Sequence, residues 1–128
     1  MTRLPAAAAA ATRIDVVRIT NGPERHGEPM TGCVVGHWEG PAVAEMLAVV
    51  GKIPTAQVTL CGFSPGWGIR AYAGPDEPPL YEAAFCYGCD QVWVWGPLVP
   101  EALHRQTFDS ASPYAQYLRL RFREEGPA

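Results

Sequence analysis

The stretch "CGFSPGWGIRAYAGPDEPPLYEAAFCYGCDQVWVWG", residues 61–96, decides the fold of this chain. Its apolar residues recur with a period of two in short segments, and Gly- and Pro-rich turn signals separate these segments. We predict strands over 69–73, 80–86 and 91–95. A further strand is predicted over 57–63, directly before the turn "SPGWG". Short strands at this spacing favour an antiparallel meander.

The preceding part of the chain adds two strands and a helix. Residues 13–20 are rich in β-branched side chains, as strands are, and residues 33–38 indicate a second, shorter strand. Residues 41–51 have a helical period, with Pro41 suited to the first turn and Gly51 to the end. The apolar positions spaced i, i+3, i+4 and i+7 are Val43, Met46, Leu47 and Val50.

The last element carries two patterns at once. "YLRLRFR" alternates as a strand does, whereas Tyr114, Leu118 and Phe122 fall at i, i+4 and i+8 of a helix. Ser112 suits the N-cap, which favours the helix over 112–123. The prediction is therefore an α+β fold with an antiparallel meander of four to six strands, a central amphipathic helix and a C-terminal helix.

Composition excludes several classes of function. The net charge is −3 and the pI is about 5.5, with Lys52 the only lysine, so clustered cations for nucleic acid or anionic membrane are lacking. No apolar run approaches the roughly 20 residues that span a bilayer. The alanine-rich residues 1–12 are interrupted by Pro5 and are expected to be an extension of the domain 13–128, not a cleaved export signal. The expected compartment is the cytoplasm.

Three of the four cysteines lie in the opening stretch. Cys61 ends one predicted strand, Cys86 ends another, and Cys89 follows across a tight connection. The antiparallel order should bring all three to one end of the sheet. Two thiolates in a C-x-x-C hairpin suit zinc, and a structural site requires four ligands. Cys61 would be the third ligand and His37 or Cys33 the fourth; alternatively, Cys33 and His37 form the second pair without Cys61.

Three other interpretations of the cysteines remain open. C-x-x-C is also a redox dithiol motif, although here it joins two strands instead of opening a helix. A passive disulfide could join Cys61 to Cys86 or to Cys89. Alternatively, the reduced cysteines simply fill the core as small apolar side chains.

Four residues are candidates for contact with a partner protein. Trp67 is expected to be exposed at a turn tip, where an aromatic ring is costly to keep unless it meets a partner. Arg70 either clamps a carboxylate or faces solvent from its strand. Asp76 and Glu77 lie in an acidic loop over 74–79. No recognisable catalytic signature accompanies them.

The opening stretch also resembles a pattern found in small bacterial proteins of no established activity. These proteins carry a C-F-x-P-x-x-G-I-R segment followed by C-F-x-C, and the likeness covers about a quarter of the chain. Gly62 is additional, and Tyr87 replaces a common Phe. The matching positions are Cys61, Phe63, Pro65, Gly68, Ile69, Arg70, Cys86 and Cys89. The resemblance implies a cysteine neighbourhood but no particular chemistry.

These observations favour a non-enzymatic protein-interaction module. Size and composition are similar to those of immunity or antitoxin-type proteins of high-GC bacteria, so the expected partner is another protein, such as a cognate toxin or effector. The cysteine cluster would then be structural, with no cofactor or with zinc. The alternative is a small zinc-binding or thiol-dependent enzyme or sensor centred on Cys61, Cys86 and Cys89.

Overall fold

The computed structural model describes residues 1–21, 28–57 and 62–126. In these residues it contains one six-stranded antiparallel sheet and two α-helices, which confirms the predicted α+β class. The strands lie in the order β2-β1-β3-β4-β5-β6. Their bounds are β1 Arg13–Asn21, β2 Thr31–Glu39, β3 Trp67–Tyr72, β4 Tyr81–Cys86, β5 Gln91–Trp95 and β6 Arg105–Thr107; the helices are α1 Pro41–Gly51 and α2 Pro113–Glu125.

Helix α1 forms where the helical period predicts it. Pro41 begins the helix, and Val43, Met46 and Val50 are buried while Leu47 is half-buried. These apolar side chains form one stripe, and the stripe packs against the sheet. The helix ends at Gly51, as predicted.

Helix α2 resolves the ambiguous C-terminal pattern. Ser112 is its N-cap, with Oγ accepting a hydrogen bond from the Ala115 N–H at 3.3 Å. Leu118 and Phe122 are fully buried, but Leu120 between them is 53% exposed. A strand would have placed all three on one face, so the four-residue spacing of the buried pair identifies the helix.

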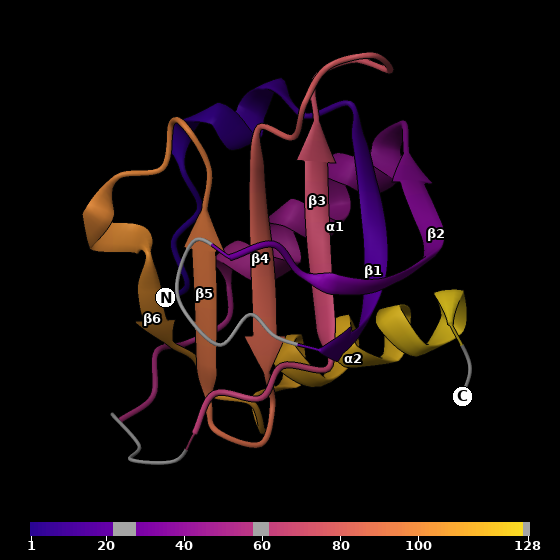
Figure 1. Cartoon of the computed structure of the whole chain (residues 1–128). Coiled ribbons are helices and arrows are strands. Elements are labelled where there is room, and N and C mark those ends of the chain that lie inside the picture. Colours follow the sequence, from indigo (N-terminus) through magenta and orange to yellow (C-terminus); the bar gives the residue numbers. More distant parts are fainter. Residues whose placement is uncertain (22–27, 58–61, 127–128) are drawn as a thin grey trace.

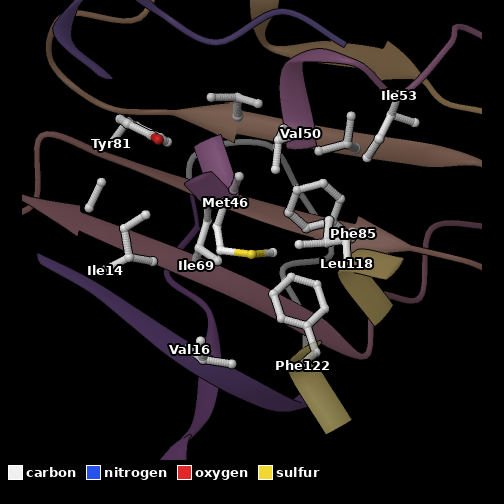
Figure 2. Close-up of a cluster of buried hydrophobic side chains, with 14 of the residues drawn as sticks. Ile14, Val16, Met46, Val50, Ile53, Ile69, Tyr81, Phe85, Leu118 and Phe122 are labelled. Atoms are coloured by element: carbon white, nitrogen blue, oxygen red, sulfur yellow. The ribbon is translucent and has the colours of Figure 1, made fainter. Parts of the chain in front are cut away.

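Both helices lie on one side of the sheet, behind it in Figure 1. The main core fills the space between them and the sheet. Figure 2 shows Met46 and Val50 from α1 and Phe122 from α2 meeting sheet residues such as Ile69 and Phe85. Among the described residues, no helix covers the opposite side of the sheet; we call it the helix-free face.

The helix-free face is nevertheless apolar and largely buried. Residues of its cluster are Val17, Ile19, Met30, Ala84, Trp93 and Trp95, with Phe63 packed against them. Phe63 stacks on Trp93 with ring centroids 3.9 Å apart. In Figure 1 the segment that leads into β2 crosses in front of the sheet, and Met30 from this segment is 3% exposed. On this side, irregular segments therefore cover the apolar residues of the sheet, as the helices do on the other side.

Two expectations about the centre of the chain need correction. Of the predicted strand 57–63, residues 58–61 lie outside the described residues, and Gln57, Gly62 and Phe63 belong to no strand. The edge of β3 that this strand would have paired is occupied by β1, in register from Arg13 opposite Tyr72. Because β1 is nine residues long and rich in buried β-branched side chains, it completes the sheet there.

Trp67 is not at an exposed turn tip. It is the first residue of β3, opposite Arg18 and Phe85, and it is half-buried. Its ring stacks on Phe122 at 5.6 Å, on the helix side of the sheet. The prediction ended the turn "SPGWG" two residues too late, because the pairing of β3 with β1 extends the strand to Trp67.

The alanine-rich N-terminal segment packs on the domain. The Thr2 N–H donates to the Ile53 carbonyl at 2.7 Å, and Arg3 and Gln106 exchange two hydrogen bonds of 2.8 Å. Leu4 and Ala8 lie against the main core. A shallow apolar hollow of about 480 Å³ separates this segment from α1.

Candidate functional site

A row of polar side chains crosses the helix-free face. Residues directly opposite one another on neighbouring strands point to the same face of a sheet, so strand register defines the row. Across five strands the row reads His37, Asp15, Arg70, Glu82 and Trp95. Two of its members, His37 and Arg70, are site candidates from the sequence.

Arg70 and Glu82 form the centre of the row. The Arg70 Nε donates to Glu82 Oε1 at 2.7 Å, and Nη2 donates to the Met30 carbonyl at 3.0 Å. The side chains are 21% and 18% exposed. Of the two alternatives for Arg70, the structure favours the clamp: its guanidinium holds the carboxylate of Glu82 from its own chain, beneath the segment that carries Met30.

Trp95 completes this contact. Its indole Nε1–H donates to Glu82 Oε2 at 3.0 Å, so each carboxylate oxygen of Glu82 accepts one of these two hydrogen bonds. The arrangement holds Glu82 in one orientation and fixes the indole beside it. A charged group held by buried partners in this way is pre-organised for binding.

His37 and Asp15 form the other end of the row. Their Nδ1 and Oδ1 atoms lie 2.7 Å apart, with Asp15 9% and His37 54% exposed in their side chains. Arg13 Nε lies 3.2 Å from the same oxygen, and its guanidinium stacks over Tyr72. A carboxylate that binds Nδ1 holds the imidazole in one orientation.

A pocket of about 330 Å³ opens where β5 ends and β4 begins, beside Glu82 and Trp95. We call it the end pocket. Its other lining residues include Tyr81, Gly96 and four prolines, here called the wall prolines: Pro29, Pro78, Pro79 and Pro97. Gly96 has φ +154° and lies so close to β4 that a Cβ there would meet the Leu80 carbonyl oxygen at 2.7 Å. Only glycine allows this approach of the two strands.

The acidic loop, residues 74–79, leads directly into the end pocket. Asp76 and Glu77 are exposed, as the sequence predicts, and the loop ends in two of the wall prolines. Figure 1 shows this connection between β3 and β4 projecting beyond the end of the sheet. The two carboxylates therefore directly precede two residues of the pocket wall, although neither of them lines the pocket.

Two of the three clustered cysteines are neighbours in the structure. Cys86 and Cys89 lie together, both 2% exposed, with the Cys89 Sγ 4.0 Å from the Cys86 carbonyl oxygen. Cys61 lies outside the described residues, so its proximity to them stays a prediction. Cys33 is exposed on β2.

His37 does not join the buried pair of cysteines. It lies on β2, and β1 and β3 separate β2 from β4. Three strand spacings correspond to about 14 Å, far beyond the length of a zinc–ligand bond. Within residues 1–21, 28–57 and 62–126, no three His, Cys, Asp or Glu side chains are grouped so that they could hold a metal ion.

Sequence reasoning did not identify Asp15, Glu82, Trp95 or the wall prolines as parts of a site. A signal was present for the two acids, since each is the one carboxylate in a strand rich in buried apolar residues and a buried charge requires a partner. The assembly of the pocket had no comparable signal. Its walls come from three connections that are distant in the sequence.

Comparison of the chain with protein-family models, curated proteins and solved structures finds no match. Among the described helices, none has the length and apolar character required to cross a membrane.

Proposed function

We propose that this protein is a non-enzymatic interaction module, an immunity or inhibitor-type factor that binds another protein through the end pocket and the acidic loop. The observation that supports this proposal most directly is that the acidic loop leads into the wall of the end pocket. A partly enclosed pocket beside Trp95 opens next to a loop that exposes Asp76 and Glu77. Aromatic rings in pockets, surrounded by polar groups, are typical of the centres of protein interfaces.

The stiffness of the surface supports this function. Pro75, Pro78 and Pro79 flank the two acids of the loop, and each proline restricts the backbone before any partner binds. Glu82 is held by Arg70 and the indole. Binding therefore orders few additional groups, and the entropy that association costs is correspondingly small.

A cytoplasmic location is part of the proposal. Cys33 and Cys86 form no disulfide in the described part of the chain, a state that the reducing cytoplasm maintains. The alternative of a zinc- or thiol-dependent centre is supported by the adjacency of Cys86 and Cys89. It depends on Cys61 as a third participant.

The test is capture of a partner from lysate of the native host by charge-reversed variants. Glu77→Lys and Asp76→Lys should reduce recovery of the partner by more than about ten-fold, because like charges across an interface cost several kcal/mol. Glu124→Lys is the matched control, since Glu124 is exposed on α2, on the helix side of the sheet. Recovery that is equal for all variants with unchanged thermal midpoints would refute the proposed surface.

A further inference from the structure

We propose that the end pocket receives an arginine side chain of the partner. This inference rests on the proposed function and names the chemistry that its binding site recognises. The volume of about 330 Å³ is near the lower end of the roughly 300–1,000 Å³ found for ligand pockets. A single long side chain is therefore a better match than a helix or a large ligand.

The hydrogen-bonding groups of the wall favour a donor over an acceptor. Proline has no N–H, so the wall prolines offer the pocket no backbone hydrogen-bond donor and provide apolar ring carbons. Glu82 is an acceptor, and the indole N–H of Trp95 is already donated to it. Glu82 is the charged side chain among the residues that line the pocket, so an anionic ligand would meet a like charge there, whereas a guanidinium carries five donors and no acceptor.

Glu82 retains capacity for a second cation. An ionised carboxylate offers about four acceptor positions, and the contacts with Arg70 and Trp95 occupy one on each oxygen. Arg70 lies in the row beneath Met30 and does not line the pocket. An incoming guanidinium would therefore reach Glu82 through the pocket, whose lining does not include Arg70.

The charged groups of the neighbouring acidic loop are negative, as is Glu82 in the pocket wall. Asp76 and Glu77 add two exposed carboxylates in the loop directly before the wall prolines Pro78 and Pro79, on a chain whose net charge is −3. The apolar stem of an arginine can pack on the proline rings while its head remains near carboxylates. The planar fork of a guanidinium can donate two parallel hydrogen bonds to a carboxylate, which an ammonium cannot, so arginine is preferred over lysine.

The experiment titrates isotope-labelled protein with N-acetyl-arginine amide and follows the indole N–H signal of Trp95. The matched control probe is N-acetyl-citrulline amide, which has nearly the same shape and no charge. We expect saturable shifts with a Kd of roughly millimolar for the arginine probe. N-acetyl-lysine amide should bind more weakly, and the citrulline probe should bind at least about ten-fold more weakly still than arginine.

A variant pair locates the bound cation. Glu77→Gln should weaken binding of the arginine probe by roughly two- to five-fold, the effect of one exposed charge, while Glu124→Gln should leave it unchanged. Equal binding of the citrulline and arginine probes, or no shift of the Trp95 signal up to about 50 mM probe, would overturn the inference.

The experiments distinguish a failure of the arginine assignment from a failure of the proposed interaction function. If the arginine probe does not bind but partner capture still depends on Glu77, the interaction surface stands and the arginine assignment is wrong. If the probe binds and capture is unaffected by Glu77→Lys, the chemistry of the pocket stands and the proposed interaction function is refuted.

Discussion

Glu82 connects the core of the helix-free face to its proposed binding pocket. Its carboxylate accepts from Arg70 and from Trp95, and the three side chains come from three adjacent strands. The exposed fractions of about a fifth place the ion pair between a surface pair, which contributes little, and a buried one, whose disruption is costly. The same contact therefore affects stability and shapes the binding surface.

Removing one member of this pair should cost more than removing both. Glu82→Leu should lower the free energy of unfolding by about 2–3 kcal/mol, because it leaves the guanidinium of Arg70 and the indole N–H without their acceptor. The double variant Arg70→Met, Glu82→Leu should recover roughly 1 kcal/mol or more of this loss. Urea unfolding measures both, with Glu124→Leu as an exposed control. A double variant that is less stable than Glu82→Leu would contradict the assignment.

Tyr81 carries a buried hydroxyl that, in the described part of the chain, has no hydrogen-bond partner. Burial raises the pKa of Tyr81 above its ordinary value of 10.0, since a phenolate would be desolvated there. A raised pKa favours the folded state while the ring is protonated. This stability is complete below about pH 10 and is lost as the pH rises further.

Tyr81→Phe should therefore be neutral or up to about 1 kcal/mol more stable at pH 7, because it removes an unsatisfied polar group. Above pH 10 the variant should lose less stability than the original chain. Tyr87→Phe is the control: burial also raises the pKa of Tyr87, but its hydroxyl donates to the Ala115 carbonyl at 2.7 Å, so the variant should be destabilised at pH 7. Urea unfolding at pH 7 and near pH 10.5 tests both. Equal destabilisation of the two variants at pH 7 would show that Tyr81 has a partner.

The C-x-x-C motif lies at the turn between β4 and β5, and a hydrogen bond to a distant part of the chain fixes this turn. Asp90 has φ +55°, a left-handed conformation that aspartate tolerates better than most residues. Its carbonyl accepts from the Phe108 N–H at 3.0 Å. Cys86 and Cys89 thus sit in a turn that is tied to the chain beyond β6, and both thiols are buried.

This burial predicts two classes of thiol. In a Cys61→Ser variant, Cys33 should react with a thiol reagent in the native state, and Cys86 and Cys89 should react only after unfolding. Counting titrated thiols before and after urea makes the measurement. Three rapidly reacting thiols would contradict burial. About one zinc per original chain, lost in Cys86→Ser and Cys89→Ser, would instead support the metal-binding alternative.

The elements with strong local signals were predictable from the sequence. For α2, the cap at Ser112 and the spacing of Leu118 and Phe122 act within a few residues, so no distant contact is needed to identify the helix. β4 and β5 likewise follow from alternation between turns. Segment 57–63 shows the opposite case. Its alternation resembles a strand, but the partner edge it required is taken by β1, and nothing within the segment reveals that competition.

At the level of the whole chain, topology was the part that sequence reasoning could not supply. The order β2-β1-β3 inserts an N-terminal strand beside one more than 50 residues later, and local patterns carry no record of such pairings. The candidate site could not be predicted for the same reason, because it depends on these long-range contacts. Asp76, Glu77 and Arg70 were recognisable as single residues, whereas the pocket beside Glu82 exists only after three separate connections meet.

The position of β1 between β2 and β3 also determines the order in which strands can pair during synthesis of the chain. One edge of β1 can pair with β2 once residue 39 has left the ribosome, but its other edge can pair only after residues 67–72 have been synthesised. At roughly 5–20 residues per second, the 33 residues from 39 to 72 take about 2–7 s to synthesise. During that interval the hairpin presents an open strand edge with the fully apolar residues Val16 and Val17. The nascent chain is therefore most exposed to association with its neighbours before β3 emerges.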